Sequence, residues 1–232
     1  MTSLNTLDLR QNPLHIPPEI LEKTDNPQEI LKYYFSEHKK ILNETIRNIY
    51  FHVPMWFGMM VLFTCSVVYS VKYLRKPNLL YDIYATAYAR TGMLFGILGL
   101  ITGAMWANYT WGKAWSNDIK QLGAAMALLV YAAYFVLRNS MIDIDKRARV
   151  GAVYNIFAFA MLFLALWIVP RLVESLHPGG AGNPGADPRD MDGRMRMIFW
   201  LGAVPGFILL GIWISTIIIR FRKIEDKNLL HA

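Results

Sequence analysis

Uncharged apolar runs alternate with short charged segments along most of the chain. If His52 is neutral, five such runs of 17 to 23 residues cover 51–71, 91–112, 121–137, 150–170 and 197–219. A helix needs about 20 apolar residues to cross a bilayer, and it satisfies its own backbone polar groups there. The pattern therefore predicts an all-α fold, a multi-pass integral membrane helix bundle with about five transmembrane helices. The third run is the shortest and needs Lys120 and Arg138 to reach the membrane surface.

Residues 1–48 differ from the rest because they are polar and contain four prolines. Between Pro27 and Asn48, apolar residues recur near a 3.6-residue period, which predicts an amphipathic helix on the membrane surface. No run in this segment is long enough for a signal peptide or an anchor. We divide the chain into a polar segment at 1–48, a transmembrane domain at 49–223 and a charged tail at 224–232.

Composition agrees with a membrane protein, since 54% of the residues are hydrophobic and 18% are charged. A net charge of +7 would suggest a nucleic-acid partner for a soluble protein. Here the basic residues gather at the ends of the predicted helices, where orientation and membrane lipid explain them, so we expect no nucleic-acid partner. The single cysteine, Cys65, lies within the first run and indicates packing, because there is no CxxC motif.

The distribution of charge predicts which side of the membrane each connection faces. Twelve Lys and Arg residues lie on one side, in 72–90, 138–149 and 220–227, and six lie on the other, in 113–120 and 171–196. The positive-inside rule places the larger set in the cytoplasm. The connections 106–118 and 171–196 and the start of the first helix are therefore predicted to be extracytoplasmic.

One of these connections carries three tryptophans, Trp106, Trp111 and Trp115, beside Gly112 and Asp118. A single Trp at a membrane surface is ordinarily an interfacial anchor, but three clustered indoles make a flat apolar surface that suits a large planar ligand. Gly112 would let the backbone approach that ligand closely. Asp118 either orients a lysine or a backbone amide at the site, or starts the next helix as an N-terminal acid.

Two histidines, His52 and His177, are predicted on the same side of the membrane. Each alone fits an interfacial or a solvated loop residue, but together two imidazoles can hold an iron from opposite axial positions. No acid–base pair with a nucleophile stands out, which disfavours hydrolytic chemistry. Four further aromatic residues are candidates to line the pocket: Tyr50, Phe51, Trp56 and Tyr109. The other histidines, His15, His38 and His231, have no comparable placement.

Three segments are similar to those of a known family. They read RNIYFHVP at 47–54, WGKAWSND at 111–118 and LHPG at 176–179. In this order they resemble the haem-handling, WWD-motif membrane proteins of cytochrome c maturation, and most closely the haem exporter protein C (CcmC) group. The family pattern WGxxWxWD is matched except at Asn117, whose amide is free to bond a haem propionate where the family has a Trp. The resemblance covers roughly residues 41–222.

The family has six transmembrane helices, with both chain ends in the cytoplasm. The helix expected before His52 is missing from the polar residues 1–48. This leaves three interpretations: a diverged region, a misassigned start, or a re-entrant or surface arrangement.

The resemblance implies a b-type haem, bound transiently at the periplasmic face of the bacterial inner (cytoplasmic) membrane. His52 and His177 would be the axial ligands, over a surface made by Trp106, Trp111, Gly112, Trp115 and Asp118. The protein would present haem to a periplasmic haem chaperone of the CcmE type, and an ABC-type complex of the same pathway would release the loaded chaperone. This is a transfer scaffold more than an enzyme, with an assisting role in haem ligation left open.

A different class of protein is the main alternative. The tryptophans could form an aromatic belt on a non-haem membrane subunit or a small transporter. A transporter should carry ionisable residues at mid-bilayer, whereas the polar residues noted in the runs are neutral: Thr64, Ser66, Ser70, Asn155 and Ser215. A haem lyase of the same superfamily would be a much longer chain than 232 residues.

Overall fold

The computed structural model describes residues 43–173, 175–177 and 191–230, together with Lys32, Ser36 and Lys40. All regular structure in this part of the chain is helical. Five helices within it are long and apolar enough to cross a membrane: Asn43–Arg75, Leu79–Trp111, Ile119–Asn139, Ile144–Leu172 and Gly193–Glu225. The predicted multi-pass all-α bundle is confirmed. Most of the predicted amphipathic helix lies outside the described residues, as do His15, His38 and His231, and the three-part division of the chain stays a prediction.

The helices follow one another in a simple order. They are α3 (His52–Arg75), α4 (Leu79–Trp111), α5 (Ile119–Asn139), α6 (Ile144–Phe163), η3 (Leu164–Ile168), α7 (Val169–Leu172), α8 (Gly193–Ile198), η4 (Phe199–Ala203) and α9 (Val204–Leu230). The helical residues 43–49 precede α3 across a turn at Tyr50 and Phe51. The elements η3 and η4 are π-helical turns, a widening of the helix that is frequent at functional sites.

The start of α4 differs from the predicted span 91–112, whereas its end agrees within one residue. Residues 79–89 were expected in a connection but form the first turns of the helix, and Trp106 and Trp111 lie inside its last turns. The reason for the difference at the start is charge. Arg90 ends the uncharged run and Asp82 lies one short stretch before it, yet the helix continues through both. The Asp82 carboxylate is neutralised by Arg138 of α5, with both pairs of atoms 2.7 Å apart. A hydropathy pattern does not show that a charged residue is neutralised by a residue far away in the sequence.

Four of the helices begin at a polar residue whose side chain accepts a backbone N–H of the first turn. These N-caps are Asn78 for α4, Asp118 for α5, Asp143 for α6 and Asp192 for α8. The interpretation of Asp118 as the start of a helix is therefore confirmed.

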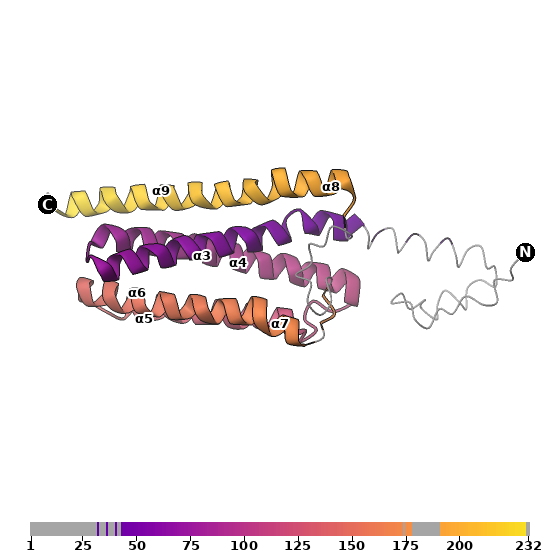
Figure 1. Cartoon of the computed structure of the whole chain (residues 1–232), viewed down its shortest axis with the longest axis horizontal. Coiled ribbons are helices and arrows are strands. Elements are labelled where there is room, and N and C mark those ends of the chain that lie inside the picture. Colours follow the sequence, from indigo (N-terminus) through magenta and orange to yellow (C-terminus); the bar gives the residue numbers. More distant parts are fainter. Residues whose placement is uncertain are drawn as a thin grey trace, which may run out of the picture.

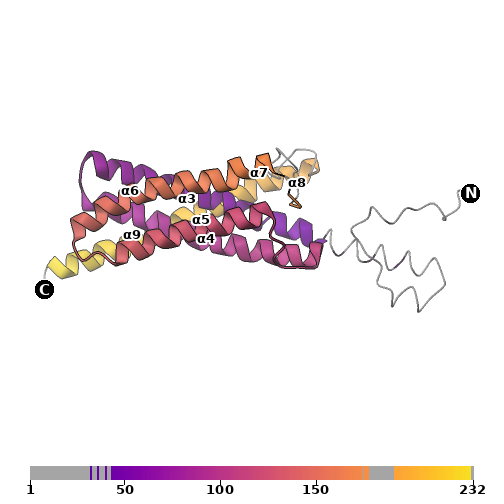
Figure 2. The same ribbon diagram turned by 90° about the horizontal axis from the view of Figure 1, so that it is seen from below.

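Helices α3 and α4 form the centre of the bundle, with α9 on one side and the α5–α6 pair on the other (Figures 1 and 2). Four glycines of α4 let it pack closely on α3, because a Cβ at each would meet a side chain of that helix. The facing pairs run antiparallel: Gly92 with Phe63, Gly96 with Met59, Gly99 with Trp56 and Gly103 with His52. This register places His52 against the last turns of α4.

Four of the five polar residues noted in the runs bond to side chains of other helices, and the fifth, Thr64, donates to the carbonyl of Met60 within α3. Asn155 Nδ2 of α6 donates to the hydroxyls of Ser66 and Ser70 of α3, at 2.7 and 2.8 Å. Ser215 of α9 donates to Thr91 of α4 at 2.8 Å. These contacts link helices across the core, so they account for these residues without an ion path.

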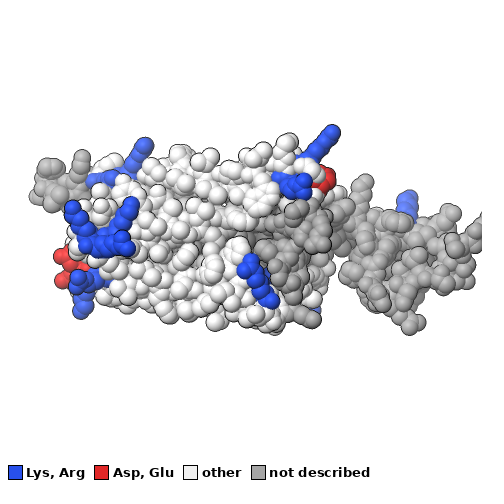
Figure 3. All heavy atoms as spheres, viewed as in Figure 1, with Lys and Arg blue, Asp and Glu red and all other residues white. Residues whose placement is uncertain are grey.

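Charged side chains gather at the two ends of the bundle, and a broad middle band of the face in Figure 3 shows none. We name the ends by their residues. The histidine end holds His52 and His177, and the arginine end holds Arg90, Arg138, Arg147 and Arg222. The predicted orientation, with the histidine end outside the cytoplasm, stays a prediction.

Candidate functional site

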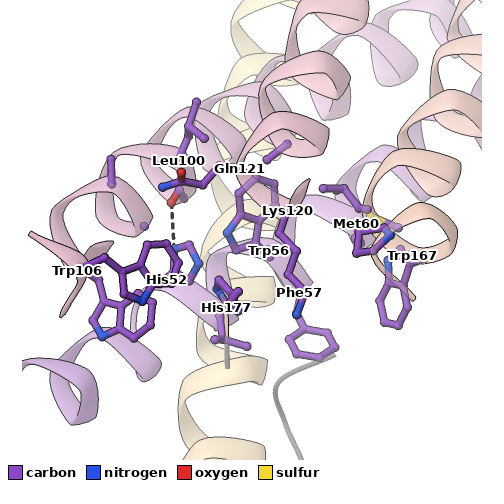
Figure 4. Close-up of a pocket in the computed structure, with 18 residues that line it drawn as sticks. His52, Trp56, Phe57, Met60, Leu100, Trp106, Lys120, Gln121, Trp167 and His177 are labelled. Atoms are coloured by element: carbon purple, nitrogen blue, oxygen red, sulfur yellow. Dashed lines mark hydrogen bonds between the residues drawn. The ribbon is translucent and has the colours of Figure 1, made fainter. Parts of the chain in front are cut away.

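A pocket opens at the histidine end between α3, α4, α5 and the η3–α7 segment (Figure 4). Its walls are largely aromatic and aliphatic, and they include both histidines. The lining residues that matter below are His52, Trp56, Trp106, Trp111, Lys120, Gln121, Trp167 and His177. The cavity measures about 170 Å³, whereas pockets that enclose a small molecule hold roughly 300–1,000 Å³. A larger planar ligand would therefore lie partly outside it.

His52 is the first residue of α3, is buried, and has a defined tautomer. Its Nδ1 lies 2.9 Å from the carbonyl oxygen of Gly99 and 3.1 Å from Oγ1 of Thr102. A carbonyl oxygen only accepts hydrogen bonds, so Nδ1 carries the proton and Nε2 keeps its lone pair. A metal-ligating histidine ordinarily donates its other ring N–H to such a carbonyl. The imidazole is thus oriented as a ligand would be.

His177 brings a second imidazole to the same place. The centres of the His52 and His177 rings are 6.1 Å apart and their planes are inclined by 35°. Two metal–nitrogen bonds of about 2 Å each, on opposite sides of one ion, place the ring centres roughly 6 Å apart. The observed separation fits one ion held between the rings. Among the described residues there is no group of three His, Cys, Asp or Glu that could hold a metal.

Asp118 holds the segment that carries His177. Its carboxylate accepts from the Ser175 hydroxyl at 2.9 and 3.0 Å and from the Leu176 backbone N–H at 2.7 Å. It also accepts the Lys120 N–H as the N-cap of α5. Asp118 does not line the pocket. It joins the start of α5 to the segment 175–177, and so sets where the second imidazole lies.

The three tryptophans of the motif separate into two groups. Trp106 and Trp111 line the pocket, with ring centres 5.2 Å apart in an edge-to-face arrangement. The Trp106 ring also lies 5.7 Å from that of His177, and its indole N–H donates to Thr45 at 3.0 Å. Trp115 is 42% exposed and is not among the lining residues, although it was predicted with the other two.

Two further motif positions serve the loop between α4 and α5. Gly112 ends α4 with a left-handed φ of 70°, a conformation that glycine adopts without strain. It does not line the pocket, so its role here is to terminate the helix. Asn117 also has a left-handed φ, of 57°, which Asn tolerates well. Its amide oxygen accepts the Trp115 indole N–H at 2.7 Å, so this oxygen is used within the loop.

Of the four additional aromatics named from the sequence, Trp56 lines the pocket and the others do not. Tyr50 donates to the carbonyl of Met195, Phe51 packs against Phe207, and Tyr109 is 60% exposed. Their proximity to the predicted membrane surface carried no information about which way each side chain points.

The sequence interpretation missed several lining residues, among them Trp167, Lys120 and Gln121. Trp167 comes from the π-helical turn η3. It lies one helical turn before Pro170, at the end of the fourth apolar run. Its place near the end of a predicted span, on the same side of the membrane as the histidines, could have indicated that it lines the pocket. Lys120 was expected only to reach the membrane surface. It is half-buried in the wall and is the only Lys or Arg among the described lining residues.

Comparison with known proteins gives a consistent picture. The model of the family described as cytochrome C assembly protein matches residues 26–177. The chain is 25% identical over 188 residues to the heme exporter protein C of Paracoccus denitrificans, covering 81% of this chain and 76% of that one. With the heme exporter protein C of Rhodobacter capsulatus it is 22% identical over 199 residues, covering 84% and 79%.

A second group of relatives is longer. The chain is 32% identical over 109 residues to the cytochrome c biogenesis protein CcsA of Pelargonium hortorum, covering 47% of this chain and 32% of that one. The chain therefore spans about a third of the length of this relative and about three quarters of the two above.

Proposed function

The chain belongs to the cytochrome C assembly protein family, and from this membership and the histidine pocket we propose that it binds haem and hands it on during cytochrome c biogenesis. Two groups of relatives carry the names heme exporter protein C and cytochrome c biogenesis protein. One observation carries the proposal for this chain. The ring centres of two imidazoles lie 6.1 Å apart in a pocket whose lining includes four indoles.

The donor set suits haem better than a free metal ion. A porphyrin supplies four nitrogen ligands of its own, so the protein needs to provide only the axial pair. His52 would ligate through Nε2, and His177 from the other side. Trp106 and Trp111, from the Trp-rich motif of this chain, would lie against the macrocycle. Trp56 and Trp167, which lie outside the motif, would join them.

The polar part of the pocket suits the edge of the haem. Lys120 is placed to offer a charge-assisted hydrogen bond to a propionate, and Gln121 can donate or accept beside it. The small cavity leaves much of a haem outside the wall. Partial exposure agrees with a site that must release its ligand, since a fully enclosed haem would be slow to leave.

The charge distribution supports a direction of transfer. With the histidine end outside the cytoplasm, haem would be presented to a periplasmic partner. We propose a haem chaperone of the CcmE type as the acceptor and an ABC-type complex as the agent that releases it. The haem is of the b type and bound transiently in this scheme.

The test is the haem content and absorption spectrum of histidine variants purified in mild detergent. We expect His52→Ala and His177→Ala each to lose most of the haem that co-purifies with the wild type and to shift the Soret band of the remainder. In His177→Gly, added imidazole should restore the spectrum by entering the space left by the ring. Tyr109→Ala is the matched control, an exposed aromatic residue at the same end. Wild-type haem spectra in both histidine variants would exclude axial ligation.

A further inference from the structure

A second pocket lies at the arginine end, about as far from the histidines as the bundle allows. Its floor is the first third of α4, and its walls come from the end of α5, the start of α6 and the end of α9. It measures about 460 Å³, which is within the range of pockets that hold small molecules. Because α9 packs mainly on α3 and α4, the pocket lies in the angle between α9 and the α5–α6 pair.

The walls of this pocket carry an excess of positive charge. Four arginines line it, Arg90, Arg138, Arg147 and Arg222, with Asp82 as the single acid among the described lining residues. Arg138 and Asp82 neutralise one another through two hydrogen bonds of 2.7 Å. Arg222 forms an ion pair with the exposed Glu225, at 3.5 Å.

Some of the positive charge in the walls is not neutralised within the described part of the chain. No described carboxylate lies within ion-pair distance of Arg90 or Arg147. Arg147 Nε is buried without a hydrogen-bond partner in the described part of the chain, and Arg147 lines the pocket. Buried polar atoms are ordinarily satisfied, so an unpaired donor beside unneutralised guanidinium groups points to an anionic ligand. Arginine is the side chain best suited to phosphate.

Apart from Thr86 and Asn139, the remaining lining residues are apolar: Leu79, Ile83, Ala87, Ile144 and Ile218. A free inorganic anion gains nothing from such surfaces, whereas an amphiphile does. The pocket lies at the arginine end of the bundle, and the face shown in Figure 3 carries charge at the ends and none in a broad middle band. In a bilayer that covers this uncharged band, lipid phosphates would lie near the charged ends. Basic pockets between transmembrane helices are known sites for anionic headgroups.

We propose that this pocket binds the phosphate of an anionic phospholipid, with Arg90 from the α4 floor, Arg222 from the α9 wall and Arg147 from the α6 wall. The acyl chains would lie on the apolar residues between α9 and the α5–α6 pair. The site is independent of the haem proposal, since it shares no residue with the histidine pocket.

The experiment measures lipid retention by the full chain in native mass spectrometry, with phosphatidylglycerol and phosphatidylcholine as probes. Wild type should retain phosphatidylglycerol in preference to phosphatidylcholine. The variants Arg90→Gln and Arg222→Gln, singly and together, should lower that retention, the double variant by about tenfold. Arg75→Gln with Lys76→Gln is the matched control, because it removes two exposed charges from the same end but outside the pocket.

Each outcome decides the proposal. Equal retention of the two lipids by wild type, or an equal loss in the control, would overturn it. Displacement of the lipid by millimolar inorganic phosphate would also overturn it, by showing a site for the free anion. The haem spectrum reports folding separately: it should be unchanged in every arginine variant, whether or not lipid is lost.

Discussion

The two ends of the bundle differ in the groups that bond their buried polar side chains. At the histidine end, His52 and Asp118 are held by backbone groups, the Gly99 carbonyl and the Leu176 N–H, and the surrounding walls are indoles. At the arginine end, the buried polar group Arg138 is held by a side chain of opposite charge, Asp82. A neutral imidazole needs only one carbonyl to be oriented, whereas a guanidinium needs an anion. The first end therefore presents metal-ligating nitrogens, and the second presents positive charge.

The largest expected effect is on stability, and it comes from removing Asp82, the anion that neutralises the buried Arg138. Asp82→Ala would leave the Arg138 guanidinium buried without its anion, and we expect the free energy of unfolding to fall by about 3 kcal/mol. Thermal melting in detergent measures the loss. Asp145→Ala, at an exposed acid of the same end, should have little effect. Haem binding by the folded fraction should be retained, and its loss would contradict the separation of the two ends.

The next prediction disturbs the histidine end without touching a polar group. A Cβ at Gly103 would lie 2.7 Å from Cε1 of His52, so Gly103→Ala should displace the imidazole and lower haem affinity by about tenfold. Haem titration followed at the Soret band gives the affinity. Gly206→Ala is the control, because nothing lies within 4 Å of an added Cβ there. Unchanged affinity in Gly103→Ala would mean that His52 can move without cost.

A smaller effect is expected at Asp118, where only one of two acceptor atoms is removed. Asp118→Asn keeps an oxygen for capping α5 but cannot accept from both Lys120 N–H and Leu176 N–H as the carboxylate does. We expect haem affinity to fall several-fold because His177 is less firmly placed. Asp192→Asn should be neutral, since Asp192 caps α8 through a single oxygen. Equal behaviour of the two variants would remove the positioning role.

The smallest effect distinguishes two tryptophans of one motif. Trp111 lines the pocket and Trp115 does not, so Trp111→Ala should weaken haem binding while Trp115→Ala leaves it within about twofold of wild type. The same pair should be compared for loading of a haem chaperone. A loss of loading in Trp115→Ala, with haem still bound, would assign the exposed indole to the partner. Equal haem loss in both variants would contradict the pocket as described.

Much of the fold could be predicted from local patterns. The five apolar runs predicted the spans, because a bilayer requires about 20 apolar residues in a row. The paired histidines and the Trp motif were singled out because few other residues suit a planar metal complex. The errors arose where a helix continued through a charge, as at Asp82, and where the motif was taken as one surface, as at Trp115.

Sequence by itself determined the number and placement of the candidate spans, the gathering of basic residues near their ends and the pairing of His52 with His177 as candidates. These properties depend on composition within a window or on short motifs. Only the tertiary structure decided that Asp118 holds the His177 segment, that Trp167 and Lys120 join the wall, and that Arg138 finds Asp82. Each of these depends on the rotation and register of packed helices, which are set by contacts such as Gly103 against His52 between residues far apart in the chain.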